Sequence, residues 1–212
     1  MARPFDLSLY LVTDPKLTAR RGLVETVSQA VAGGVTIVQL RDPEAKGRAL
    51  VEAARALIAL LRPLGIPLIV NDRVDVALAA DADGVHLGQD DMEPAPARAQ
   101  LGPDRILGLS VGTPQELAVS DLTSVDYVGV GPVRATGTKA DAGSAIGIEG
   151  LADMRRRINL PLVGIGGLDA SLAAHVIRAG AEGVAVVSAL CAAPDITAAA
   201  RHLRAEVDRA RG

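Results

Sequence analysis

The sequence contains very few aromatic residues. Its 212 residues include one Phe, two Tyr and no Trp, so aromatics make up 1% of the chain. Proteins that bind single-stranded nucleic acid stack bases on aromatic side chains. The formal net charge of −3 also provides no basic surface for a polyanion. We therefore expect no nucleic-acid partner, and a core filled by aliphatic and small residues.

Cysteine and long apolar runs are also scarce. Cys191 is the only cysteine, which excludes an internal disulfide and is typical of a reducing compartment. The first ten residues lack the apolar segment of a secretory signal peptide. No apolar run approaches the roughly 18 residues that a membrane span requires. These absences predict a cytoplasmic protein with no membrane partner.

Short, continuous apolar runs alternate with helical segments along the chain. Eight such runs occur, from SLYLVT at 8–13 to GVAVVS at 183–188. Runs without polar alternation are typical of parallel strands covered on both faces. Eight strand–helix units predict an α/β fold, a (β/α)8 TIM barrel that forms a single domain over 1–212. A doubly wound open sheet is the alternative, but the first strand lacks the glycine-rich turn of dinucleotide-binding folds.

The helical segments are expected between the strands and after the last one. A long connection, 131–146, is expected to be irregular. The predicted helices are 22–33, 46–62, 73–80, 95–101, a segment that begins at Pro114, 148–158, 170–179 and 195–210.

Two aspartates follow neighbouring predicted strands. Asp72 comes after PLIV and Asp91 after DGVHLG. Carboxyl ends of parallel strands open on one side of a sheet, where α/β folds place their chemistry. Two carboxylates beside the Asn71 amide form an oxygen-ligand set suited to Mg²⁺, although an aspartate in such a position can also simply cap the next helix. The strand ends carry no histidine, which argues against a triad hydrolase or a zinc enzyme.

Glycines at the late strand ends predict a phosphate site. Gly166 and Gly167 end the seventh run, and Val187-Ser188 ends the eighth. Loops after strands seven and eight form a recurrent phosphate site in barrels, through backbone N–H groups. The alternative is that these glycines only permit tight turns.

The loop at 133–143 and one arginine supply further polar groups. Thr136, Thr138 and Lys139 provide two hydroxyls and a cation over the expected cavity, and Arg41 lies opposite. His86 lies within a strand and faces away from its neighbours, and we interpret it as a hydrogen-bonded structural residue rather than a base.

Nearly the whole chain resembles the thiamine phosphate synthase family, whose members join the pyrimidine and thiazole halves of thiamine. The order of NDRVD, GVHLGQxD and TxTK is specific to that family. The motifs that carry the resemblance are LYLVTD (9–14), QLRD (39–42), NDRVD (71–75), ADGVHLGQDDM (82–92), GLSVGT (108–113), YVGVGP (127–132), TGTK (136–139), VGIGGL (163–168) and AGAEGVAVVSAL (179–190).

The resemblance implies a role for each matching residue. Asp72 and Asp91 are the implied Mg²⁺ ligands. The implied contacts to the pyrimidine diphosphate are Gln39, Arg41, Asn71, Ser110 and Lys139. The implied contacts to the thiazole phosphate are Thr136, Thr138, Gly167, Val187 and Ser188. Arg41, Lys139 and Ser110 are the implied catalytic residues. The reaction would be a dissociative substitution in which the thiazole nitrogen replaces diphosphate at the pyrimidine methylene carbon.

The chain departs from the family pattern at two positions. Pro43 stands where a lysine is usual, and Gly112 stands where a histidine is common. Our hypothesis is that Lys46 or Arg134 replaces the missing cation. A thiazole tautomerase on the same barrel is an alternative function, as is a non-catalytic barrel that binds thiazole phosphate. We also expect a small homo-oligomer, and a lid formed by 134–147.

Overall fold

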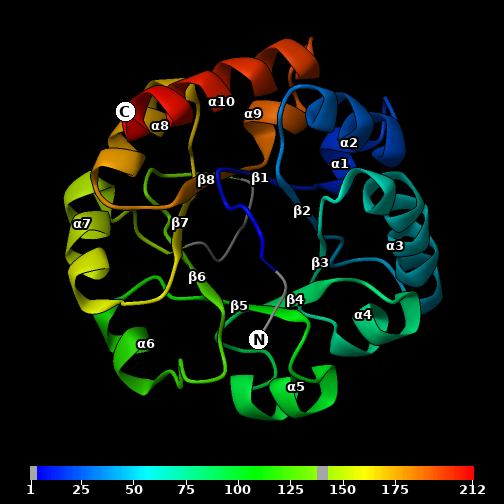
Figure 1. The fold of residues 1–212 in the computed structure, drawn as a ribbon, viewed down its shortest axis with the longest axis horizontal. Coiled ribbons are helices and arrows are strands. Elements are labelled where there is room, and N and C mark those ends of the chain that lie inside the picture. Colours follow the sequence, from blue (N-terminus) through cyan, green and yellow to red (C-terminus); the bar gives the residue numbers. More distant parts are fainter. Residues whose placement is uncertain (1–3, 138–142) are drawn as a thin grey trace.

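A computed structural model gives the structure of residues 4–137 and 143–212. Eight parallel strands form a closed barrel in sequence order, with the helices packed around the outside (Figure 1). The predicted (β/α)8 TIM barrel is therefore confirmed. The strands are β1 (Leu9–Val12), β2 (Ile37–Leu40), β3 (Leu68–Asn71), β4 (Gly84–Leu87), β5 (Ile106–Ser110), β6 (Tyr127–Val130), β7 (Leu162–Ile165) and β8 (Gly183–Val186).

The helices lie close to the predicted ranges, and most connect one strand to the next. They are α1 (Pro15–Thr18), α2 (Leu23–Ala32), α3 (Gly47–Leu61), α4 (Val74–Ala80), α5 (Pro94–Leu101), α6 (Pro114–Val119), α7 (Gly147–Arg157), α8 (Ala170–Arg178), α9 (Ser188–Cys191) and α10 (Ile196–Arg211), with a 3₁₀ turn η1 (Arg62–Leu64).

Two short helices were not predicted, because four residues are too few to show a helical period. Asp14 caps α1: its carboxylate accepts hydrogen bonds from the backbone N–H groups of Lys16 and Leu17, and Pro15 occupies the first turn. Helix α9 begins at Ser188, whereas the apolar run predicts a strand over 183–188; the strand stops at Val186. Ser188 therefore opens a helix rather than closing a strand.

The strands are buried on both faces, as their continuous apolar character predicts. Outward side chains such as Leu11, Val38 and Val85 pack beneath the helices. Inward side chains form a second cluster that contains Tyr10, Ile69 and Tyr127. The inward cluster fills the barrel below its mouth, so the cavity described next has a solid floor.

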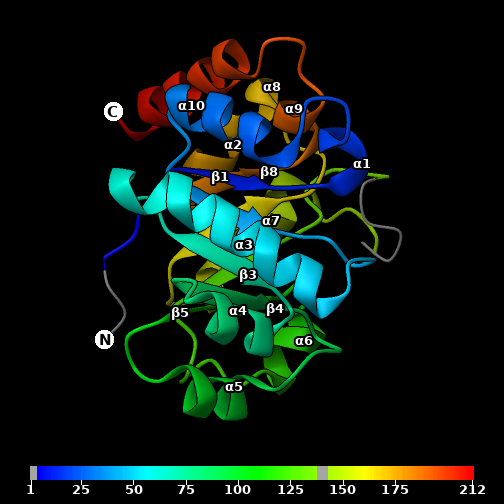
Figure 2. The same ribbon diagram turned by 90° about the vertical axis from the view of Figure 1, so that its right-hand side faces the viewer.

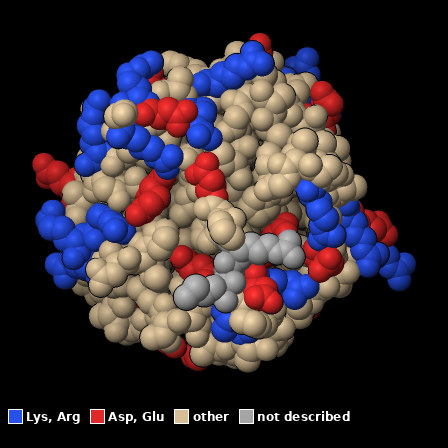
Figure 3. All heavy atoms as spheres, in the orientation of Figure 1, with Lys and Arg blue, Asp and Glu red and all other residues tan. Residues whose placement is uncertain are grey.

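The described chain begins and ends on the same side of the barrel, and the described parts of the segment that joins β6 to α7, 131–137 and 143–146, lie on the opposite side (Figure 2). On the face seen in Figure 3, Lys and Arg side chains lie among Asp and Glu side chains. None of the described helices is both long enough and apolar enough to cross a membrane.

Candidate active site

A cavity of about 600 Å³ opens at the carboxyl ends of the strands. Every one of the eight strands, or the residues directly after it, contributes to its wall. All predicted site residues that the structure describes line this one cavity: Gln39, Arg41, Asn71, Asp72, Asp91, Ser110, Thr136, Gly167, Val187 and Ser188. Thr138 and Lys139 lie outside the described residues. The placement of strand ends at one mouth thus brings together residues that are up to 149 positions apart, from Gln39 to Ser188.

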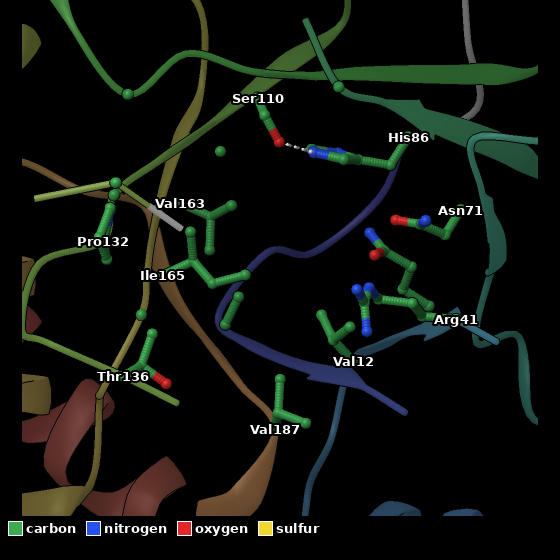
Figure 4. Close-up of a pocket in the computed structure, with 18 of the residues that line it drawn as sticks. Val12, Arg41, Asn71, His86, Ser110, Pro132, Thr136, Val163, Ile165 and Val187 are labelled. Carbon is green, nitrogen blue, oxygen red and sulfur yellow. Dashed lines mark hydrogen bonds between the residues drawn. The ribbon is translucent and has the colours of Figure 1, made fainter. Parts of the chain in front are cut away.

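Arg41 and Asn71 point into the cavity from the side of β2 and β3 (Figure 4). The buried hydroxyl of Thr13, at the end of β1, accepts a hydrogen bond of 3.0 Å from the backbone N–H of Arg41. This bond ties the start of the loop after β2 to the neighbouring strand. The guanidinium of Arg41 is therefore carried by a fixed stretch of backbone, as the binding of an anionic group requires.

Asp72 and Asp91 both line the cavity. The backbone of Asp72 is left-handed, with φ at 62°, and its N–H donates to the carbonyl oxygen of His86 at 2.8 Å. One carboxylate oxygen of Asp91 accepts a 2.7 Å hydrogen bond from the N–H of Gly88. Among the described residues, no group of three or more His, Cys, Asp or Glu is placed to hold a metal ion. Mg²⁺, however, is commonly held by one or two carboxylates together with substrate phosphates, so this donor set fits that ion.

Thr136 faces Arg41 and Asn71 across the cavity (Figure 4). The N–H of Val133 donates to Ile165 O and the N–H of Arg134 to Gly166 O, so the chain after β6 runs beside the end of β7. Gly167, with φ at +64°, allows this approach: a Cβ there would lie 2.7 Å from Arg134 O. Glycine at this position therefore brings Thr136 close to the loop after β7.

A second cavity, of about 840 Å³, shares several residues with the first, including Arg41, Thr136 and Ser188. Arg134 lines it, and its guanidinium forms a 2.6 Å ion pair with Asp169. That arginine and the hydroxyl of Ser171 lower the pKa of the Asp169 carboxyl, with the Ser171 hydrogen bond as the larger cause. Arg134 is thus near the site but already paired with a carboxylate. Lys46 precedes α3 and lines neither cavity.

The two departures from the family pattern also lie at the cavity. Pro43 lines both cavities, so the position of the usual lysine is on the wall. Gly112 packs tightly: a Cβ there would lie 2.8 Å from Gly131 O. Its N–H donates to the Glu116 carboxylate at 2.7 Å. A histidine at position 112 would require the backbone around Gly131 to move.

A chain of hydrogen bonds runs across the barrel interior at the bottom of the cavity, and sequence reasoning did not find it. Gln39 Nε2 donates to the Tyr10 hydroxyl at 2.9 Å, and the Tyr10 and Tyr127 hydroxyls are 2.8 Å apart. Tyr127 is 2.9 Å from His86 Nδ1, and His86 Nε2 is 2.9 Å from Ser110 Oγ. The expectation of a hydrogen-bonded His86 thus agrees with these contacts, and the ring also lines the cavity.

One signal could have revealed this network. Both tyrosines of the chain lie on strands, at positions that face the barrel interior. A buried tyrosine hydroxyl needs a hydrogen-bond partner, so two such residues predict a polar chain inside the barrel. Burial raises the pKa of both phenols well above its usual value, and both therefore remain protonated at neutral pH.

Comparison with known proteins gives one consistent result. A family model described as thiamine monophosphate synthase matches residues 9–190. Thiamine-phosphate synthase of Azorhizobium caulinodans is 70% identical over 211 residues, and that of Xanthobacter autotrophicus is 72% identical over 211 residues; each alignment covers 100% of both chains. A solved thiamine phosphate pyrophosphorylase from Pyrococcus furiosus is 37% identical, covers 97% of this chain and 98% of its own, and superposes with a TM-score of 0.87.

Proposed function

The chain belongs to the thiamine monophosphate synthase family, and we propose that the cavity at the barrel mouth is where its synthase reaction takes place. As a thiamine-phosphate synthase the protein is a transferase. The observation that carries the assignment of the site is that all ten predicted residues within the described chain line one cavity. The proposed substrates are a pyrimidine diphosphate and a thiazole phosphate, and the products are thiamine phosphate and diphosphate.

The pyrimidine diphosphate is proposed to bind on the side of β2 to β5. Arg41 is a fixed cation on this side, and Asn71, Gln39 and Ser110 supply amides and a hydroxyl around it. Guanidinium groups bind phosphate oxygens through paired N–H donors. Lys139, outside the described residues, stays a predicted second cation.

The thiazole phosphate is proposed to bind at the opposite side, between the loops after β6, β7 and β8. Gly167 permits the approach of the chain that carries Thr136, and Ser188 begins α9 beside it. Hydroxyls and backbone N–H groups are the donors that such a site offers to a phosphate. Thr138 stays a predicted contact here.

Mg²⁺ is the proposed cofactor, held by Asp72 and Asp91. Together with the diphosphate oxygens, two carboxylates complete a donor set that Mg²⁺ accepts. When bound, the ion would neutralise charge on the leaving diphosphate.

In the proposed reaction, the bond between the methylene carbon and the diphosphate oxygen breaks, and its electron pair leaves with diphosphate. The lone pair of the thiazole nitrogen forms the new carbon–nitrogen bond. The electron-rich aminopyrimidine carries the positive charge between these events, so no protein nucleophile is needed. The chain contributes position and electrostatics: Arg41 and Ser110 stabilise the departing oxygens, and the apolar floor formed by Val163 and Ile165 limits access of water.

Calorimetric titration with the pyrimidine diphosphate in Mg²⁺ tests the proposed site. Arg41→Ala removes a charge-assisted contact and should weaken binding by roughly tenfold or more. Leu64→Ala, at an exposed position far from the cavity lining, is the control and should leave binding unchanged. Equal affinities for the wild type and Arg41→Ala would show that the diphosphate does not bind on this side of the cavity.

The same titration tests whether another cation replaces the lysine that Pro43 displaces. If Arg134 contributes, Arg134→Ala should weaken binding, and Asp169→Asn should strengthen it by freeing the guanidinium. Lys46→Ala tests the other candidate. If Arg134→Ala and Lys46→Ala both bind as the wild type does, the compensation hypothesis is wrong.

Four further expectations complete the proposal: a single domain over 1–212, a small homo-oligomer, a cytoplasmic location and a lid. All described strands belong to one closed sheet, in agreement with a single-domain organisation. A small homo-oligomer and a cytoplasmic location stay predictions. So does a lid at 134–147, of which 138–142 lie outside the described residues.

A further inference from the structure

The hydrogen-bond chain at the bottom of the cavity has a direction, because each hydroxyl has one hydrogen to donate. A neutral imidazole likewise has one donor nitrogen and one acceptor nitrogen. If one end of such a chain is fixed as a donor, every buried hydroxyl hydrogen finds an acceptor within the chain only when all the following bonds point the same way. The five members come from five different strands, β2, β1, β6, β4 and β5, and all of them except Tyr127 also line the cavity.

The Gln39 end fixes a direction. Gln39 is 5% exposed and its amide nitrogen donates to the Tyr10 hydroxyl oxygen. The Tyr10 hydrogen is then directed to Tyr127, and the Tyr127 hydrogen to Nδ1 of His86. Nδ1 therefore accepts, and the imidazole hydrogen is on Nε2. That hydrogen points to Ser110 Oγ, which is 2.9 Å away.

The Ser110 end requires the same direction. A diphosphate offers only acceptor oxygens to a protein hydroxyl, so Ser110 binds it through its own hydrogen. If the chain ran the other way, Ser110 would donate that hydrogen to His86 Nε2. It would then present only lone pairs to an anion. This second argument rests on the proposed function.

We propose that His86 is a positioning residue: as the Nε2–H tautomer, it donates to Ser110 and so directs the Ser110 hydroxyl hydrogen into the cavity, toward the diphosphate. His86 itself transfers no proton. Its role is to make Ser110 a donor rather than an acceptor when substrate arrives, before the leaving group gains charge.

Two glycines form the slot that holds the imidazole in place. A Cβ on Gly108 would lie 2.5 Å from His86 Nδ1 and 2.2 Å from Tyr127 Cζ. A Cβ on Gly129 would lie 3.2 Å from His86 Cε1. The rings of His86 and Tyr127 thus occupy space that a side chain on the neighbouring strands would fill. Their tilted contact, with centroids 5.4 Å apart, adds to this fixed geometry.

The tautomer can be measured directly on the wild-type protein without substrate. Two-bond ¹H–¹⁵N correlation spectra distinguish protonated from unprotonated ring nitrogens. His86→Gln identifies the signals of His86 among the three histidines. We expect Nε2 to carry the hydrogen and Nδ1 to be bare. A hydrogen on Nδ1, alone or together with one on Nε2, overturns the proposal whether or not the enzyme turns over.

Kinetics test the consequence for Ser110. Tyr127→Phe removes the donor to Nδ1 and keeps the ring. It should lower kcat/KM roughly tenfold, because the imidazole is then no longer held as the Nε2–H tautomer and the hydrogen bond from Ser110 to the charged diphosphate is lost. Tyr10→Phe is the matched control. It removes a phenol hydroxyl that lies one hydrogen bond further from His86 and leaves the Tyr127–His86 bond intact, so it should lower kcat/KM clearly less.

A double-mutant cycle separates positioning from mere stability. In a Ser110→Ala background, Tyr127→Phe should change kcat/KM by no more than about twofold, because the hydroxyl that it orients is absent. A full tenfold loss in that background would show that Tyr127 acts on something other than Ser110 and would refute the proposal. Failure of the proposed function is distinguishable, since the wild type would then make no thiamine phosphate while its tautomer could still be read.

Discussion

Gly108 offers a sharp test of how the barrel interior is packed. The residue lies at the centre of β5, and its missing side chain leaves room for two rings from neighbouring strands. An alanine methyl would lie 2.2 Å from Tyr127 Cζ and 2.5 Å from His86 Nδ1. Neither ring can simply rotate away, because both are held by hydrogen bonds on the far side. Gly108→Ala must therefore displace a strand or break part of the hydrogen-bond chain.

The expected cost follows from two opposing terms. Overpacking a well-filled core costs about 1–3 kcal/mol, and contacts this short place Gly108→Ala at the upper end. Replacing glycine also reduces the entropy of the unfolded chain, which raises the free energy of unfolding by about 0.4–1 kcal/mol. The net loss in the free energy of unfolding is about 2 kcal/mol. For a chain of this size, that loss lowers Tm by about 4–8 °C.

Gly129→Ala is the matched control, on the adjacent strand and beside the same imidazole. Its methyl would meet only the His86 ring, with Cε1 at 3.2 Å and Nε2 at 3.6 Å. The mild contact and the entropic gain nearly cancel, so we expect a change within about 0.5 kcal/mol. Urea unfolding followed by circular dichroism measures both variants. If Gly108→Ala is as stable as Gly129→Ala, the account of a tightly filled slot around His86 is wrong.

Two further predictions concern residues outside the cavity. The Arg98 guanidinium pairs with Asp126 at 2.6 Å and donates to three backbone carbonyls, so Arg98→Ala should lower the free energy of unfolding in urea by about 3 kcal/mol. Arg209→Ala is the comparison: this arginine is exposed and pairs with Glu206 in the adjacent turn of its helix, so the loss should be below about 1 kcal/mol. Equal losses would contradict this reasoning. Burial raises the pKa of the Cys191 thiol to about 11, from about 9. Iodoacetamide at pH 8 should therefore alkylate Cys191 far more slowly in folded than in urea-unfolded protein. The free energy of unfolding should also fall as the pH rises from about 9 towards 11, because over this range the thiolate is favoured only in the unfolded chain. Rapid alkylation of the folded protein would show that the thiol is exposed.

The barrel and most of its mouth could be predicted from the sequence, because both follow from simple periodic features. Continuous apolar runs specify buried parallel strands, and closure then places residues such as Asp72, Ser110 and Ser188 around one cavity. No side-chain detail is needed for that step. The position of each residue along its own strand is enough.

Contacts that depend on the barrel register could not be predicted in the same way. The Tyr10–Tyr127 bond joins residues 117 positions apart on strands that are not neighbours. It forms only because Gly108, between His86 and Tyr127 in the register, has no side chain. The ion pair of Arg134 with Asp169 likewise depends on how the chain after β6 packs beside β7. Such pairings are set by three-dimensional packing and leave no local pattern in the sequence.

The most direct test of the central claim is turnover by the purified protein. It would be mixed with the pyrimidine diphosphate, the thiazole phosphate and Mg²⁺, and both thiamine phosphate and diphosphate would be measured. The account predicts that the two products form in equal amounts, and that EDTA or Asp72→Asn abolishes both. Absence of thiamine phosphate from folded wild-type protein that binds both substrates would contradict the account. Undiminished turnover in EDTA and in Asp72→Asn would contradict the proposed metal site.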